Sequence, residues 1–236
     1  MNQGQFIVFE GGDGTGKSTQ AARLAAWLAA AGHDTLVTFE PGDSVVGARL
    51  RDVLLHTAAP LSPRAEALLY AADKAQHLAE TVEPALAAGR IVICDRYVDS
   101  MMAYQGAGRA LDLADIERLA WWSVGGLRPD LTVVMDVPPR SAMAGKAALD
   151  RMEAAGDDFH QRVRRYFLTL AAADPRRYLV VNGRDPIDQV SQTIRDRVAD
   201  LLDRSALDPD RAAGRRVELS GAGPAGRGSA DGIGPG

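Results

Sequence analysis

The sequence predicts a doubly wound α/β fold, with a five-stranded parallel sheet flanked by helices. Short apolar runs alternate along the chain with longer Ala- and Leu-rich segments of helical periodicity. The apolar runs are rich in β-branched residues and do not alternate with polar ones, which is typical of strands buried on both faces. Hydrophobic residues make up 46% and charged residues 25% of the 236 residues, as in ordinary globular domains.

The elements can be assigned in order along the chain. Strands are expected at Phe6–Phe9, Thr35–Phe39, Ile91–Cys94, Leu131–Met135 and Tyr178–Val181. Helices are expected at about 17–31, 62–88, 112–124, 157–172 and 186–203. Gly32 and Gly89 act as stop signals for the first two helices. Together these elements predict one domain over residues 1–204.

The last 32 residues differ in composition from the rest of the chain. They contain eight glycines and few large apolar side chains, so they cannot bury enough surface to offset the entropy of ordering. We expect residues 205–236 to be a disordered tail. A basic arm around Arg211, Arg215 and Arg216 is the alternative, and it is disfavoured because Asp208, Asp210 and Glu218 lie nearby in the sequence.

Charge, cysteine and histidine content exclude several classes of protein. A balance of 27 basic and 31 acidic residues, with net charge −4, argues against a surface that grips long nucleic acid. Cys94 is the single cysteine, which excludes a disulfide framework, and the four histidines lack metal-ligand spacing. His77 is expected to be a structural hydrogen-bonding residue. Without a signal-peptide pattern or a long apolar run, the chain is expected to be cytoplasmic and without a membrane span.

A phosphate-binding motif follows the first predicted strand. Residues 11–18 fit G-x-x-x-x-G-K-[ST] in the strand–loop–helix setting that a P-loop requires. The glycines let backbone amides turn toward phosphate oxygens, and the next helix adds the positive end of its dipole. Lys17 suits the β- and γ-phosphates of ATP, and the Ser18 hydroxyl suits Mg²⁺. The fold is therefore expected to be of the P-loop NTPase type. The expected ATP-binding residues are Gly11, Gly12, Asp13, Gly14, Thr15, Gly16, Lys17, Ser18 and Thr19.

A second polar cluster begins at the end of the third predicted strand, with Asp95 and Arg96. Ligands of doubly wound sheets bind beyond the carboxyl ends of the strands. The planar guanidinium of Arg96 can hold a phosphate bidentately, and Asp95 can orient it or hold a magnesium-bound water. From spacing alone, an Asp–Arg pair that only braces the sheet fits equally well.

Several segments carry a family resemblance when taken in order. They are Phe9–Thr19, Glu40–Gly42, Ala72–Ala75, Asp95–Tyr97 with Ser100 and Ala103–Gly106, Pro129–Thr132, Asp136–Val137 and Asp150–Glu153. Together they resemble the bacterial thymidylate kinase family of P-loop nucleoside monophosphate kinases. The resemblance covers about residues 5–200, and the Asp-Arg-Tyr…Ser…Tyr-Gln segment is its most specific part. It implies phosphoryl transfer from ATP–Mg²⁺ to dTMP in dTTP synthesis, by a homodimer.

The resemblance also implies an acceptor site. Arg96 would hold the acceptor phosphate, and Tyr70 would stack on the thymine ring. Tyr104 would crowd the sugar 2′ position, and Asp13 would approach the 3′-hydroxyl or the metal-bound phosphates. Lys74, Ser100 and Gln105 would hydrogen-bond the edge of the base. The implied substrate-binding residues are Asp13, Pro41, Tyr70, Lys74, Arg96, Ser100, Tyr104 and Gln105.

A lid is expected at about 138–153, before the fourth predicted helix. In the family, a glycine at position 14 of the P-loop goes with a catalytic arginine in the lid. Here the cations of the lid are Arg140, Lys146 and Arg151. The expected catalytic residues are Lys17, Arg96, Lys146 and Arg151, and the candidate magnesium ligands are Ser18, Asp95 and Glu153.

Three positions depart from the family pattern. Phe39 and Lys74 stand where the family has arginine, and Asp43 stands where glycine is common. These departures keep two alternatives open beside dTMP phosphorylation. One is a kinase for another nucleoside monophosphate or a deoxynucleoside, and the other is a nucleotide-binding regulator with weakened catalysis.

Overall fold

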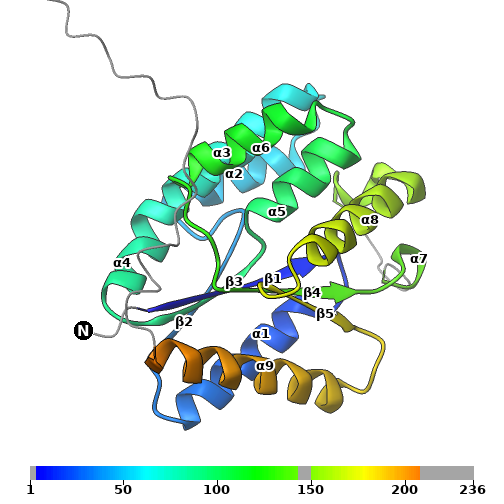
Figure 1. Cartoon of the computed structure of the whole chain (residues 1–236). Coiled ribbons are helices and arrows are strands. Elements are labelled where there is room, and N and C mark those ends of the chain that lie inside the picture. Colours follow the sequence, from blue (N-terminus) through cyan, green and yellow to red (C-terminus); the bar gives the residue numbers. More distant parts are fainter. Residues whose placement is uncertain (1–3, 143–149, 208–236) are drawn as a thin grey trace, which may run out of the picture.

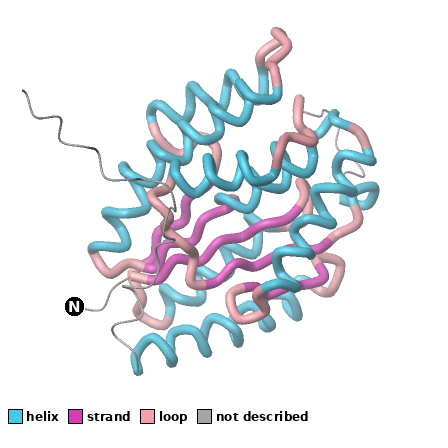
Figure 2. Tube along the Cα trace, turned by 45° about the horizontal axis from the view of Figure 1, so that its top comes forward, coloured by secondary structure: helices cyan, strands magenta, loops and turns pink. Residues whose placement is uncertain are grey.

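The computed structural model describes residues 4–142 and 150–207, which form a central sheet between two layers of helices (Figure 1). All five strands are parallel, in the order β2-β3-β1-β4-β5, which confirms the predicted fold class. The strands are β1 (Gln5–Gly11), β2 (Thr35–Phe39), β3 (Ile91–Asp95), β4 (Leu131–Asp136) and β5 (Tyr178–Asn182). Figure 2 shows these strands side by side.

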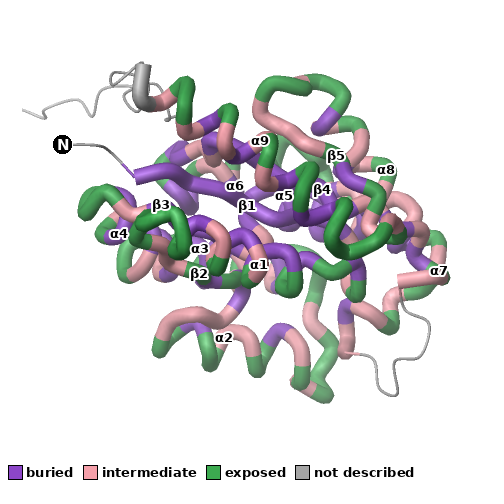
Figure 3. Tube along the Cα trace, turned by 90° about the horizontal axis from the view of Figure 1, so that it is seen from below, coloured by how far each residue is buried: buried purple, intermediate pink, exposed green. Residues whose placement is uncertain are grey.

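The central strand β1 is buried on both faces. Phe6 and Val8 pack into a core with the helices after β2 and β3, whereas Ile7 and Phe9 pack into a second core with the first and last helices. Because successive side chains of a strand point to opposite faces, an unbroken apolar run is what this position requires. The central strands β1, β3 and β4 are accordingly almost entirely buried (Figure 3).

The helices lie on both faces of the sheet, with α1 and α9 on one face and α3, α5, α6 and α8 on the other (Figure 1). Those on the first face are α1 (Lys17–Ala30) and α9 (Ile187–Leu207). The others are α2 (Val45–His56), α3 (Pro63–His77), η1 (Leu78–Val82), α4 (Glu83–Ala87), α5 (Val98–Met101), η2 (Met102–Gly108), α6 (Leu113–Ser123), α7 (Pro139–Ala142), η3 (Glu153–Ala155) and α8 (Asp157–Ala173). Segments η1 and η2 are π-helical, and η3 is a 3₁₀ turn.

Two differences from the predicted helices have physical reasons. The helix expected at 62–88 changes to a π-helical segment before Pro84, which has no amide hydrogen to continue an α-helical ladder. The sequence did not predict α2, whose first turn exposes Val45 and Val46 and which fully buries only Gly47 and Leu54. Such weak periodicity gives little helical signal.

The C-terminal boundary also differs. Helix α9 continues through Ser205 to Leu207, past the end expected for the domain at 204. Ser205 donates a hydrogen bond to the Leu201 carbonyl at 2.9 Å, as a continuing helix allows. The rest of the predicted tail, 208–236, lies outside the described residues. Across the described ranges, none of the helices has the length and apolar character needed to cross a membrane.

The sheet topology places the carboxyl end of β1 at the middle of the edge where all five parallel strands end. Strand β1 pairs with β3 on one side and β4 on the other, so the strand order reverses beside it. Phe9 is in register with Asp95, and Gly11 with Met135. The segments that follow β1 and β3 therefore emerge side by side, where doubly wound folds bind ligands.

Candidate active site

The P-loop connects the end of β1 to the start of α1, as predicted. Gly11, Gly14 and Gly16 have φ values of 131°, 72° and 93°, a region that L side chains rarely adopt. A Cβ atom on Gly14 would lie 2.3 Å from the carbonyl oxygen of Ala142, at the end of α7. The loop therefore requires glycine at position 14 both for its backbone and for the close approach of α7.

Lys17 begins α1 and turns back over the loop. Its Nζ atom donates to the carbonyl oxygens of Gly12 at 2.7 Å and Gly11 at 3.3 Å. Burial, and then the nearby positive charge of Arg96, lower the pKa of the Lys17 ammonium to about 8. Asp95 and Asp13 act in the opposite direction. Lys17 thus lies among charged groups at the place where a P-loop receives phosphate.

Two of the three predicted magnesium ligands lie together. The Ser18 hydroxyl donates to Asp95 Oδ2 at 2.6 Å. A hydroxyl and a carboxylate are the oxygen ligands that Mg²⁺ accepts beside nucleotide phosphates, so this pair fits the ion. Glu153 lies instead on η3, where its carboxylate accepts a hydrogen bond from the Asp150 amide at 3.3 Å. It does not line the cleft that contains Ser18 and Asp95.

Arg96 directly follows β3 and has a left-handed backbone, with φ of 74°. For a residue with a Cβ atom this conformation costs on the order of 1–2 kcal/mol. Its amide donates to the Phe9 carbonyl at 2.8 Å, which ties the turn to the end of β1. The unusual backbone therefore brings the side chain of Arg96 over the P-loop.

The Arg96 guanidinium is held from several sides. It donates to Gly11 O at 3.0 Å, Ser100 Oγ at 3.0 Å, Asp13 Oδ1 at 2.6 Å and Tyr104 OH at 3.2 Å. Burial alone would lower the pKa of Arg96, but the surrounding oxygens, Tyr104 and Asp13 first, keep it well above its usual range. The site thus holds a permanent positive charge in a fixed orientation.

Two clefts meet at this arginine. One, of about 560 Å³, is the acceptor cleft and is bounded by α2, α3, η2 and residues 150–152. The other, of about 810 Å³, contains the P-loop residues Gly14, Lys17 and Ser18. Both clefts include Asp13 and Arg96 in their walls, so the two spaces adjoin there.

The structure brings all eight predicted substrate-binding residues into the wall of the acceptor cleft. They are Asp13, Pro41, Tyr70, Lys74, Arg96, Ser100, Tyr104 and Gln105. They come from four separate segments of the chain, so their proximity is a result of folding. The sequence did not predict Arg51, which lines both clefts, donates to Pro41 O at 2.6 Å and lies 5.6 Å from the centre of the Phe39 ring. A guanidinium is thus present beside Phe39, the position where the family has arginine.

Each of the three groups expected to bind the base edge donates to its own buried glutamate. Lys74 Nζ donates to Glu40 at 2.5 Å, Ser100 Oγ to Glu10 at 2.6 Å and Gln105 Nε2 to Glu66 at 3.0 Å. These glutamates are at most 3% exposed. Carboxylates buried to this degree need partners, and the three polar groups supply them. Roles for Glu10 and Glu66 were missed from the sequence, although Glu66 shares helical spacing with Tyr70 and Lys74 on α3.

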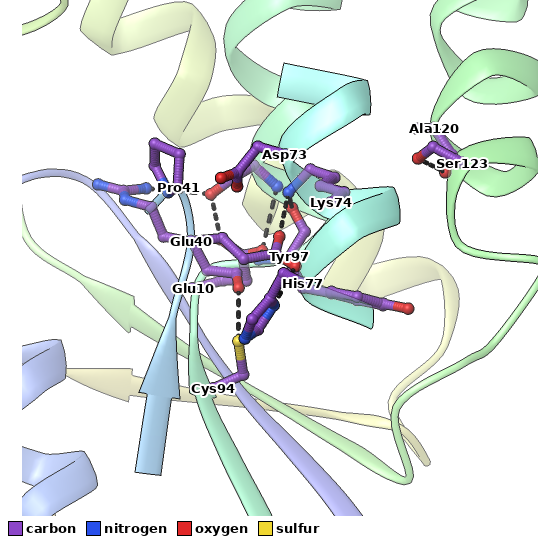
Figure 4. Close-up of polar contacts among 12 residues, drawn as sticks. Glu10, Glu40, Pro41, Asp73, Lys74, His77, Cys94, Tyr97, Ala120 and Ser123 are labelled. Carbon is purple, nitrogen blue, oxygen red and sulfur yellow. Dashed lines mark hydrogen bonds and ion pairs between the residues drawn. The ribbon is translucent and has the colours of Figure 1, made fainter. Parts of the chain in front are cut away.

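Lys74 is more constrained than the sequence implied. Its ammonium also donates to Tyr97 O at 2.7 Å, so two of its three donors are engaged inside the protein. Figure 4 shows Lys74 and His77, both on α3, turned toward Glu40. His77 Nδ1 lies 2.8 Å from Glu40 Oε1, and its Nε2 lies 2.6 Å from Thr38 Oγ1. These contacts confirm that His77 is a structural hydrogen-bonding residue.

Glu40, His77 and Cys94 bring potential metal-ligand atoms within 4.8 Å of one another. Burial raises the pKa of the Cys94 thiol well above its usual value, whereas a metal needs the thiolate. The thiol donates to Arg96 O at 3.1 Å, and Glu40 already pairs with Lys74. The cluster therefore serves as a buried hydrogen-bond network.

The two lid arginines that the structure describes, Arg140 and Arg151, each pair with a carboxylate. Arg140 is largely exposed and pairs with Asp157 at 3.2 Å. Arg151 pairs with Glu66 at 2.5 Å and donates to Leu54 O at 2.8 Å, behind the wall of the acceptor cleft. The guanidinium of Arg151 is therefore directed to Glu66, and its catalytic role stays a prediction. Lys146 lies outside the described residues.

The fold, the P-loop and the adjoining acceptor cleft define a P-loop phosphotransferase. A family model described as thymidylate kinase matches residues 9–194. The chain belongs to the thymidylate kinase family, as the resemblance in its sequence implied.

Individual relatives agree with this assignment. A thymidylate kinase of Cutibacterium acnes is 57% identical over 202 residues, which are 85% of this chain and 99% of that protein. The thymidylate kinase of Deinococcus radiodurans is 47% identical over 199 residues, covering 82% and 96% of the two chains. The crystal structure of thymidylate kinase from Ehrlichia chaffeensis covers 76% of this chain and 93% of its own, with 32% identity and a TM-score of 0.64.

Proposed function

We propose that this kinase binds ATP·Mg²⁺ on the P-loop and dTMP in the acceptor cleft, and transfers the γ-phosphoryl group to give ADP and dTDP. The observation that carries the proposal is the position of Arg96 in the shared wall of the two clefts. Phosphoryl transfer depends on bringing two phosphates together and neutralising the charge that spreads between them. A partly buried guanidinium at the junction of the clefts is suited to both tasks.

The residues around Arg96 would orient the acceptor. Arg96 would exchange some of its present hydrogen bonds for two to the dTMP phosphate. Asp13 accepts from both Arg96 and Tyr104. Although burial opposes it, the positive charges of Arg96 and Lys17 hold the pKa of Asp13 below its usual range, so it stays an acceptor. A sugar hydroxyl is a suitable donor to it. Tyr70 would stack on the base from α3.

Mg²⁺ is the expected metal, and Ser18 and Asp95 would hold it or its water ligands. When bound, the ion neutralises negative charge on the phosphates of ATP. Lys17 would leave the carbonyl oxygens of Gly11 and Gly12 for the β- and γ-phosphates. Lys146 remains our proposed lid cation. A cytoplasmic location follows from the same proposal, because both substrates are soluble nucleotides.

An acceptor panel tests the proposal. ADP release should be measured with dTMP, dUMP, UMP, CMP, AMP, GMP and thymidine, each with ATP and Mg²⁺. We expect the highest kcat/KM with dTMP. A higher kcat/KM with any other acceptor would show that this acceptor, and not dTMP, is the preferred substrate. Silence across the panel, with ATP still bound, would instead indicate a regulator without turnover.

We also propose that two copies of the chain associate through α2, α3 and α6. These helices pack against one another (Figure 1), and they carry exposed apolar side chains that include Val53, Leu68 and Trp122. Trp122 is 70% exposed, an unfavourable environment for so large an apolar surface. A second copy of the same face would cover it, in line with the homodimer that the family resemblance implies.

Trp122→Glu is expected to shift the kinase from dimer to monomer, because a charge on the proposed interface would be buried without a partner. Sedimentation velocity at micromolar concentration measures the change. Ile187→Glu is the matched control, since Ile187 is 47% exposed on α9, on the other face of the sheet. An unchanged dimer in Trp122→Glu, or a monomeric wild type, would contradict this interface.

A further inference from the structure

The side chain of Glu66 collects hydrogen bonds from three residues behind the wall of the acceptor cleft. Gln105 Nε2 donates to Oε1 at 3.0 Å. Arg109 donates through Nε to Oε1 at 3.1 Å and through Nη2 to Oε2 at 3.2 Å. Arg151 Nη1 lies 2.5 Å from Oε2. Glu66 itself is 1% exposed, so these contacts replace water around its carboxylate.

The two arginines keep Glu66 ionised in this buried position. Burial alone would raise its pKa, but hydrogen bonds from Arg109, Gln105 and Arg151 lower it below the usual value. Both arginines are fixed by further contacts. Arg109 lies over the Phe159 ring, with its Cζ atom 5.0 Å from the ring centre, and Arg151 is tied to α2 through Leu54 O. The carboxylate is therefore a rigid, negatively charged acceptor.

An ionised carboxylate accepts hydrogen bonds and cannot donate them. The amide of Gln105 must then turn its nitrogen toward Glu66, because the reverse orientation would place two oxygens against each other. Gln105 lines the acceptor cleft together with Tyr70. With one N–H held by Glu66, the amide oxygen points away from that carboxylate, and it is the only acceptor that the Gln105 side chain can offer a base in the cleft.

An oxygen at this place discriminates between pyrimidines. Thymine and uracil carry a hydrogen on N3 and can donate it to the Gln105 oxygen. Cytosine has a lone pair on N3, which would face the oxygen without a hydrogen between them. A site built to receive a hydrogen bond rejects a ligand that lacks the donor much more strongly than an apolar pocket does.

We propose that Glu66 is a positioning residue that fixes the amide orientation of Gln105 and so makes the acceptor cleft selective for pyrimidine monophosphates with an N3–H group. Glu66 does not touch the substrate; it acts through Gln105. The inference rests on the acceptor site proposed above. It adds a physical basis for the choice of thymine over cytosine, with Arg109 and Arg151 as the groups that hold Glu66 in its charged form.

The test compares kcat/KM for dTMP and dCMP in the wild type and in Glu66→Gln. The wild type is expected to prefer dTMP by at least about 100-fold. In Glu66→Gln the amide of Gln105 can turn over, because residue 66 then offers both a donor and an acceptor. The preference should fall at least tenfold, with a higher KM for dTMP. A role in stability alone would lower both values together and leave their ratio unchanged.

Glu80→Gln is the matched control. Glu80 is exposed on η1, which continues the same helix, and it accepts a hydrogen bond from Gln76. The chemical change is therefore the same but lies outside the cleft. Its dTMP-to-dCMP ratio should equal that of the wild type. If the ratio in Glu66→Gln is also unchanged while the wild type phosphorylates dTMP, the inference is wrong and the proposed function stands. A wild type that does not phosphorylate dTMP would contradict the proposed function itself.

A binding measurement on the wild type covers the case in which Glu66→Gln does not fold. Calorimetric titration with dTMP and with its N3-methyl derivative compares two ligands that differ in the N3 donor. We expect at least tenfold weaker binding of the methylated nucleotide, and weaker binding of dCMP as well. Equal affinity for dTMP and dCMP would contradict an oriented acceptor at Gln105.

Discussion

Arg96→Ala is expected to lower kcat/KM for dTMP by on the order of 10³-fold, with little change in the affinity for ATP. Alanine removes the guanidinium that lies between the two clefts and donates to Asp13, Ser100 and Tyr104. Steady-state kinetics with varied dTMP, together with direct titration of ATP, measure the two quantities separately.

Two further variants make the Arg96 result specific. Arg96→Lys retains a positive charge but loses the planar fork, so its activity should lie between those of alanine and the wild type. Arg140→Ala removes an arginine that is exposed and paired with Asp157, and it should leave dTMP turnover unchanged. An unaltered kcat in Arg96→Ala would remove the role that we assign to this residue. Melting temperatures of all three variants distinguish lost chemistry from lost folding.

Lys17→Ala should have the second large effect, a loss of turnover of about 10²–10³-fold accompanied by weaker binding of ATP. Lys17 is 6% exposed, and its ammonium supplies positive charge beside the loop amides. Its removal leaves the phosphates of ATP to the amides and the metal alone. Affinity for dTMP should be nearly unchanged, because Lys17 lines only the P-loop cleft of the two.

Arg23→Ala serves as the control for Lys17→Ala. Arg23 lies on the same helix, α1, but it pairs with Asp188 and contacts Ser191 on α9. Loss of this charge should leave ATP affinity and turnover at wild-type values. Wild-type turnover in Lys17→Ala would show that the P-loop of this chain does not act on the transferred phosphate.

The fold was predictable because its signals are local. Each strand is a short β-branched run, and the P-loop marks both the end of β1 and the start of α1. The helix α2 was missed because packing against α3 compensates for its weak periodicity. The π-helical segment before Pro84 depends on how the chain closes over the sheet, which a helical pattern does not encode.

The candidate site was predictable where one segment carries the chemistry, and less so where distant segments meet. Gln105 was named from its motif, but its partner Glu66 lies 39 residues earlier and on another helix. Lys74 lines the cleft, and its role at the base stays a prediction; its hydrogen bonds to Glu40 and the Tyr97 carbonyl were not foreseen. Such contacts are decided by tertiary packing, because a buried charge takes whichever oppositely charged group the fold places beside it.

The closeness of Gly14 to Ala142 restricts how this enzyme can evolve or be redesigned. A P-loop that supplies its own catalytic arginine needs a side chain at position 14. Here even a Cβ atom would lie 2.3 Å from a backbone oxygen, and the φ of 72° at this position is unfavourable for any residue with a side chain. One substitution therefore cannot transfer the cation that we propose for the lid to the loop; α7 would have to move in the same step. A change from a lid cation to a P-loop arginine beside the donor phosphate would therefore require the backbone of α7 to rearrange.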